Sequence, residues 1–172
     1  MIKFFGAVLV IFSFGAIGIM LGKNIKKHGE ELRQMQFGLQ VLETEIMYSQ
    51  TPLPQALKIV AKQTQGVVAK FFDTVSCELN NGLGQTAGEA WSKALEKIQP
   101  YATLTGEDLN FLDQFGQGLG LSDREDQLKR LTGVQIQLTA REKEAEVERS
   151  RFQKVWQTLG WACGLVVTLL FI

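Results

Sequence analysis

The fold is decided by the stretch HGEELRQMQFGLQVLETEI, which runs from His28 to Ile46. Its apolar residues alternate at spacings of three and four, which is the pattern of a helix with one buried face. The stripe starts at Ile25, and His28 takes the one step where an apolar residue is missing. Its remaining members are Leu32, Met35, Leu39, Leu42 and Ile46. The pattern predicts a long helix that packs one face against a core.

A turn follows this helix at Thr51-Pro52-Leu53-Pro54. Thr51 is predicted to cap the next helix, and Pro52 suits its first position. The apolar face resumes through Leu57 and, after an interruption at Gly66, continues to Leu79.

Three further helices are signalled by capping patterns. Thr86 with Glu89 and Ser122 with Glu125 match capping boxes, and Thr105 with Asp108 is a looser version. Helix-period segments follow at 90–98, at 109–119 and from residue 128 onward. We therefore expect an all-α protein with six or seven helices and no strand.

Both ends of the chain are apolar. Phe4 to Gly22 and Val155 to Ile172 contain no charge, and each is long enough for a membrane helix. A cleaved signal peptide and a buried C-terminal helix are the rival interpretations. We favour three parts, namely a transmembrane helix over 1–22, a cytosolic helical domain with stalk helices over 23–154, and a second transmembrane helix over 155–172.

The charges next to these spans predict their orientation. Six Lys and Arg residues flank the central region, which places it in the cytosol and both termini across the membrane. Those residues are Lys23, Lys26, Lys27, Arg149, Arg151 and Lys154. Small residues at Gly18, Gly22, Gly160 and Gly164 form small-xxx-small patterns that would let the two spans pack together, although such patterns also arise by chance.

Little in the sequence suggests chemistry. The formal net charge is zero, which argues against nucleic-acid binding, and we find neither a phosphate-binding loop nor clustered metal ligands. The chain has one histidine, and a partly buried structural role for His28 is the favoured interpretation. We therefore expect no enzyme activity, no cofactor and no metal. Trp91 is expected to anchor the core.

The order of these signals resembles the stage III sporulation protein AB family. The resemblance is carried by Leu42-Glu43-Thr44-Glu45-Ile46-Met47-Tyr48-Ser49-Gln50-Thr51-Pro52-Leu53-Pro54-Gln55-Ala56-Leu57, by Trp91, and by the run from Phe115 to Asp123 with Gln127. A weaker likeness runs to the cytoplasmic domain of the type II secretion platform, the F protein, through 52–57 and 84–90. This chain has one such domain where the F protein has two.

The resemblance implies an antiparallel helical bundle of the F-protein type with terminal transmembrane helices, and a non-enzymatic platform. Such a protein would sit in the outer forespore membrane, with its head in the mother-cell cytosol. It would couple a secretion-type ATPase, stage III sporulation protein AA, to channel components that link mother cell and forespore. A general helical membrane scaffold or sensor unrelated to secretion is the alternative, and homo-oligomerisation is open.

Two sets of residues complete these expectations. Glu43 and Glu45 before the turn, and Asp123 and Gln127 at the Ser122 cap, are candidate partner contacts, although all four could simply be solvated or capping residues. The predicted structural core includes Leu42, Ile46, Pro52, Leu57 and Trp91.

Overall fold

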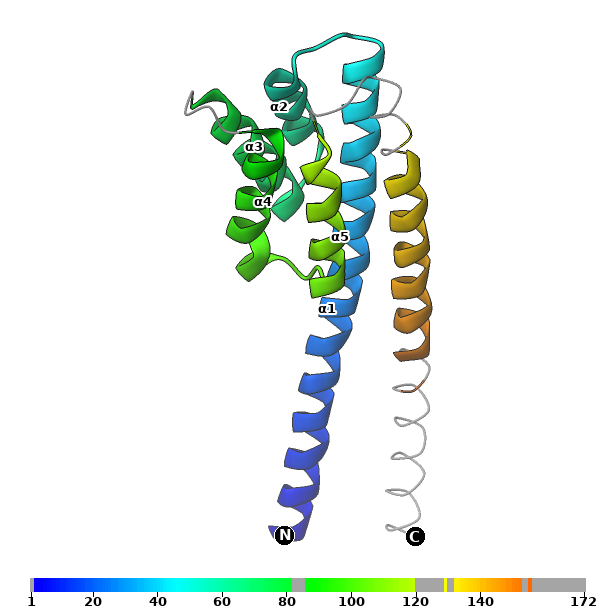
Figure 1. Cartoon of the computed structure of the whole chain (residues 1–172). Helices are drawn as coiled ribbons and strands as arrows, with labels where there is room; N and C mark the ends of the chain where they lie inside the picture. Colours follow the sequence, from blue (N-terminus) through cyan, green and yellow to red (C-terminus); the bar gives the residue numbers. More distant parts are fainter. Residues whose placement is uncertain (1, 82–85, 120–128, 130–131, 153–154, 156–172) are drawn as a thin grey trace. The chain divides into compact units, whose positions relative to one another are not determined.

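The computed structural model describes residues 2–81, 86–119, 129, 132–152 and 155, with side chains from residue 23 onward (Figure 1). Within these residues every regular element is helical, as predicted. The labelled elements are α1 (Ile2–Met47), α2 (Leu53–Gln63), α3 (Gly66–Asn80), α4 (Ala87–Ile98), the 3-10 helix η1 (Gln99–Tyr101) and α5 (Gly106–Gln117). A further helix covers 132–152 and is called the 132–152 helix below.

The chain divides into two compact units. One comprises residues 28–142 and is called the head below; the other combines residues 1–27 with 143–172. In the second unit α1 is helical from Ile2, and the side chains of residues 143–151 are exposed except at Ala145.

Among the fully described residues, no helix is both long and apolar enough to cross a membrane. The side chains of residues 2–22 and all of residues 156–172, which carry the two predicted spans, lie outside that description. The predicted packing of Gly18 and Gly22 against Gly160 and Gly164 therefore stays a prediction.

Trp91 forms the centre of the head's core, as predicted. Its side chain is fully buried, and Phe71 and Phe115 meet the indole edge-to-face at ring-centroid distances of 4.7 and 5.4 Å. Its indole N–H donates to the backbone carbonyl of Leu112 at 2.8 Å, so the one polar atom of the ring is satisfied. These contacts join α3, α4 and α5, which pack in sequence order against one another (Figure 1).

Two glycines let the helices approach this centre closely. A Cβ built on Gly116 of α5 would lie 2.1 Å from Cδ1 of Trp91, and one on Gly38 of α1 would lie 2.5 Å from Cε2 of Phe72. No real side chain fits at either distance. The aromatic rings therefore rest directly on the backbones of α1 and α5.

The predicted apolar stripe of α1 is buried over most of its length. Leu32, Met35, Leu39 and Leu42 have no exposed surface, whereas Ile46 is half-buried. Leu57 of α2 is 1% exposed, as expected for a core residue. The prediction that Pro52 belongs to the core was wrong, because its ring is exposed at the start of α2.

The turn before α2 also differs from the prediction by one residue. Pro52 is the N-cap rather than the first helical residue, and no side chain caps this helix. The hydroxyl of Thr51 donates instead to Oε2 of Glu45, so Thr51 secures the end of α1.

The other helix boundaries follow the sequence signals. α3 begins at Gly66, which has φ +61°, a conformation that glycine adopts without strain. Thr86 with Glu89 and Thr105 with Asp108 both form complete capping boxes. Ser122 and Glu125 lie outside the described residues.

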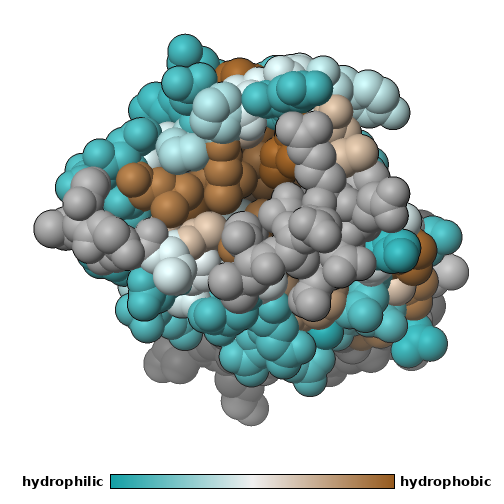
Figure 2. Space-filling model, turned by 45° about the horizontal axis from the view of Figure 1, so that its top comes forward, coloured by the Kyte–Doolittle hydropathy of each residue, from teal (hydrophilic) through white to brown (hydrophobic). Residues whose placement is uncertain are grey.

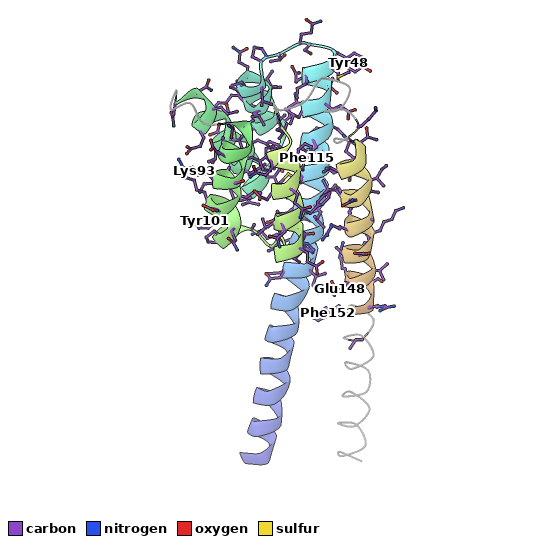
Figure 3. All side chains as sticks on the ribbon, viewed as in Figure 1. Tyr48, Lys93, Tyr101, Phe115, Glu148 and Phe152 are labelled. Carbon is purple, nitrogen blue, oxygen red and sulfur yellow. The ribbon has the colours of Figure 1, made fainter. Side chains whose placement is uncertain are left out.

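Ion pairs reinforce the packing of α3 on α4. Glu78 is 7% exposed, and its carboxylate accepts from the ammonium groups of Lys93 and Lys97 at 2.6 and 2.7 Å. These two hydrogen bonds outweigh the effect of burial and lower the pKa of Glu78. Figure 3 labels Lys93 on the side of the head formed by α4. Apolar surface remains visible among hydrophilic residues when the end bearing the α1–α2 turn is brought forward (Figure 2).

Gly116→Ala is expected to destabilise the head by about 1–3 kcal/mol, because the new methyl group overlaps an indole that is fixed by its hydrogen bond. Gly106→Ala in the same helix is the matched control. Its Cβ meets no atom within 4 Å, so its unfolding free energy should stay the same or rise slightly. Urea unfolding followed by circular dichroism measures both. Equal midpoints for the two variants would show that Trp91 does not rest on the backbone of α5.

Candidate functional site

The most elaborate polar arrangement in the head surrounds the carboxylate of Asp108. This side chain lies in the first turn of α5, and the residue is 1% exposed. His28 of α1 approaches Oδ2 through Nε2 at 2.8 Å, and Arg141 of the 132–152 helix donates to Oδ1 at 2.9 Å. The backbone N–H and the hydroxyl of Thr105 donate to Oδ2 as well. We call this arrangement the Asp108 junction.

The donors of the Asp108 junction control its charge. Burial alone would raise the pKa of Asp108, but the hydrogen bonds from His28, Thr105 and Arg141 outweigh it and hold the pKa well below the usual 3.8. The carboxylate is therefore ionised throughout the physiological range. Its position near the N-terminus of α5 also suits a negative charge, because the helix dipole is positive there.

Local features of the sequence place His28, Asp108 and Arg141 at the junction. His28 continues the apolar stripe of α1 and is therefore turned toward the interior, where 19% of its side chain stays exposed. Asp108 is fixed by its capping box with Thr105. Arg141 stacks its guanidinium over Phe111 at 5.6 Å from the ring centroid and reaches the exposed Glu107 at 3.8 Å. The expected structural role of His28 agrees with these contacts.

A second buried acid, Glu31, lies on α1 one helical turn after His28. Glu31 is 6% exposed, and its Oε2 accepts from the backbone N–H of Thr103 at 2.7 Å. Thr103 belongs to the short segment between η1 and α5. The entry to α5 is therefore held from α1 at two successive turns, by His28 and by Glu31.

Polar contacts also join α1 to the 132–152 helix within the head. Arg33 pairs with Glu142 at 2.7 Å, and the amide of Gln36 donates to the hydroxyl of Thr139 at 2.7 Å. Farther along α1, the amide of Gln135 donates to Oε2 of Glu43 at 2.7 Å. Residue numbers rise on one helix as they fall on the other, so the two helices run antiparallel.

The two acidic contact candidates on α1 have different surroundings. Glu43 is half-buried and accepts from Gln135. Glu45 is also half-buried; its backbone carbonyl accepts from Thr51 N–H at 3.1 Å, and its carboxylate accepts from the Thr51 hydroxyl at 2.8 Å. Glu45 therefore fastens the α1–α2 turn. The other two candidates, Asp123 and Gln127, lie outside the described residues.

The described residues include no group of three or more His, Cys, Asp or Glu side chains that could hold a metal ion. The Asp108 carboxylate already accepts hydrogen bonds from protein donors, and His28 is one of these donors. The Asp108 junction connects α1, α5 and the 132–152 helix through one buried charge.

Sequence reasoning identified His28 as structural but did not find its partners. His28 and Asp108 are 80 residues apart in the sequence, and Arg141 follows Asp108 after a further 33. The complete capping box at Thr105 was the one available signal, because it places Asp108 at the start of a helix. Nothing in a single sequence indicates which residue that carboxylate meets.

The fold and the Asp108 junction define an all-helical bundle protein in which one buried carboxylate connects three helices. The chain is a member of the stage III sporulation protein AB family, whose sequence description matches residues 3–172. It is 34% identical over 170 residues to stage III sporulation protein AB of Bacillus subtilis (strain 168), covering 99% of both chains. A solved structure of stage III sporulation protein AB is similar with a TM-score of 0.69 and 34% identity, covering 73% of this chain and 98% of that one.

Asp108→Asn is expected to lower the unfolding free energy by about 3 kcal/mol at pH 7, because it removes the buried charge that His28 and Arg141 both contact. The pKa of Asp108 is lower in the folded state, so its stabilising contribution is present above about pH 4 and is lost as the pH falls further. The difference in unfolding free energy between Asp108→Asn and the wild type should therefore become smaller at acidic pH. Urea titrations at neutral and acidic pH measure this.

Glu107→Gln is the matched control for Asp108→Asn, since Glu107 is the preceding residue and its side chain is 87% exposed. We expect a change of less than about 1 kcal/mol for this variant. If the difference in unfolding free energy between Asp108→Asn and the wild type stayed constant from neutral to acidic pH, the ionised state assigned to Asp108 would be wrong.

Proposed function

We propose that this sporulation protein is a non-enzymatic membrane platform that couples a cytosolic ATPase to the channel components linking mother cell and forespore. The observation that carries the proposal is the Asp108 junction. One buried carboxylate on α5 holds His28 of α1 and Arg141 of the 132–152 helix. These are the two helices that lead toward the apolar ends of the sequence.

Helix continuity supports this role. α1 is one helix from Ile2 to Met47, so the backbone of the first apolar segment continues without a break into the core helix of the head. The 132–152 helix likewise runs through the charged stretch toward Val155. A continuous helix transmits rotation or tilt, whereas a flexible loop absorbs it. A platform that receives force from a soluble motor needs such connections.

The proposed location follows from the apolar ends and the flanking Lys and Arg residues. Both ends would span the outer forespore membrane, and the head would face the mother-cell cytosol. The proposed motor is the companion ATPase, stage III sporulation protein AA. A general helical membrane scaffold or sensor is the second candidate, favoured by the small-xxx-small patterns at Gly18–Gly22 and Gly160–Gly164. Its mark would be oligomerisation through the stalks without an ATPase partner.

A reporter cysteine next to Met1, in a chain with Cys77 and Cys163 replaced by serine, is expected to react with a membrane-impermeant maleimide from outside the cytosol. The reason is the excess of Lys and Arg on the inner side of both spans. A second reporter at the exposed Gln99 is the control and should react after permeabilisation. Labelling of the Met1 reporter that also requires permeabilisation would contradict the proposed hairpin.

A flexible seven-residue Gly-Ser insertion between Glu148 and Arg149 is expected to abolish sporulation while the head stays folded, because it interrupts the connection between head and membrane. Both residues are exposed, whereas Ala145 nearby is 3% exposed and a poorer site. A helix-forming insertion of the same length at the same place is the control and should retain much of the function. Sporulation that tolerates the flexible insertion would rule out rigid coupling.

A further inference from the structure

Charge is sorted by sign along the two helices that lead toward the apolar ends of the chain. Residues 1–29 and 149–172 contain seven Lys and Arg residues and no Asp or Glu. The first acids on the way to the head are Glu30 and Glu148. Five of the basic residues have described side chains and all five are exposed; we call them the basic collar, which consists of Lys23, Lys26, Lys27, Arg149 and Arg151.

The two halves of the basic collar lie at one level. They belong to the same compact unit, and within the head Arg33 of α1 pairs with Glu142 of the antiparallel 132–152 helix. Lys26 lies seven residues before Arg33. Arg149 lies the same number of residues after Glu142. Both helices continue without a break and rise by about 1.5 Å per residue, so these equal steps end at the same distance from the Arg33–Glu142 pair.

The basic collar has acids on one side only. On the side of the head, Glu30 and Glu31 stand four residues after the last two lysines and can offset their charge. On the side of the apolar segments the sequence supplies no carboxylate. Cations at one level repel one another, and the repulsion is relieved when anions lie close to them. On this side of the basic collar, such anions must come from another molecule.

Apolar surface begins where the basic collar ends. Phe4 to Gly22 and Val155 to Ile172 carry no charge. Val155 is the residue of these segments whose side chain the structure describes, and it is 55% exposed. A soluble anion would neutralise the cations but would leave this apolar side chain in water. A bilayer, with phosphate headgroups above an apolar interior, meets both requirements.

We propose that the basic collar binds the headgroups of anionic phospholipids on the cytosolic surface of the membrane. A surface of this kind attracts nearby Lys and Arg residues and repels carboxylates, which matches the order of cations and acids along both helices. Arg149 and Arg151 suit a phosphodiester in particular, because a guanidinium donates two parallel N–H bonds to one phosphate.

The inference rests on the proposed function, since it takes both apolar segments to span the membrane, and it adds the class of lipid that the platform requires. It also goes beyond the orientation of the spans. Orientation depends on the excess of basic residues while the chain inserts, whereas a binding site depends on them in the finished protein. Anionic lipid bound to both halves of the basic collar would hold the two helices at a fixed depth in the membrane.

The test uses the full-length protein in phosphatidylcholine vesicles that contain a trace of spin-labelled phosphatidylglycerol or spin-labelled phosphatidylcholine. Electron paramagnetic resonance measures how much of each label the protein immobilises. The wild type should prefer phosphatidylglycerol, and high salt should remove the preference because it screens exposed charges. Lys26→Gln with Arg149→Gln should lower the preference about fivefold or more, since one cation near an anionic surface already accounts for about that factor.

Lys62→Gln with Lys129→Gln is the matched control, because it removes the same charge from exposed lysines of the head and should leave the preference unchanged. Circular dichroism checks that each variant is folded. Equal immobilisation of both labels by the wild type, or a full preference in the collar variant, would overturn the lipid site and leave the proposed function standing. A preference lost when phosphate replaces chloride at equal ionic strength would assign the basic collar to free phosphate instead. Wild-type protein that sodium carbonate extracts from membranes would overturn both the inference and the proposed function.

Discussion

The carboxylate of Asp108 is the constraint on which the arrangement of the head depends. A buried charge is tolerated only when its hydrogen bonds are made, and here the donors come from α1, from the 132–152 helix and from the start of α5 itself. A displacement of any one element would leave the charge undercompensated. The junction therefore fixes α1 and the 132–152 helix relative to each other, at the level where both leave the head.

α5 transfers this constraint into the aromatic core. Asp108 lies in its first turn and Gly116 in its last, so the helix that holds the junction is also the one whose backbone supports Trp91. The indole in turn donates to Leu112 of α5 and meets Phe71 of α3. A shift of α5 would thus disturb the core and the junction together. This gives a physical route between the α2–α4 side of the head and the two helices that lead away from it.

Much of this fold could be predicted from local signals. The three-four spacing located the buried face of α1, and the Thr86 and Thr105 capping patterns placed the starts of α4 and α5, because these features depend on neighbouring residues. The pairing of His28 with Asp108 could not be predicted, since it joins residues 80 apart and one sequence carries no record of contacts. Thr51 was misassigned as a cap because its hydroxyl bonds back to Glu45.

Two faces of α1 carry the contacts that hold the head together. Its apolar face packs in the core, where Leu32 and Leu39 have no surface left. Its polar flank binds the 132–152 helix through Arg33 and Gln36. His28, on the same helix, also meets Asp108. A displacement of α1 would therefore disturb the core, the contacts with the 132–152 helix and the Asp108 junction together.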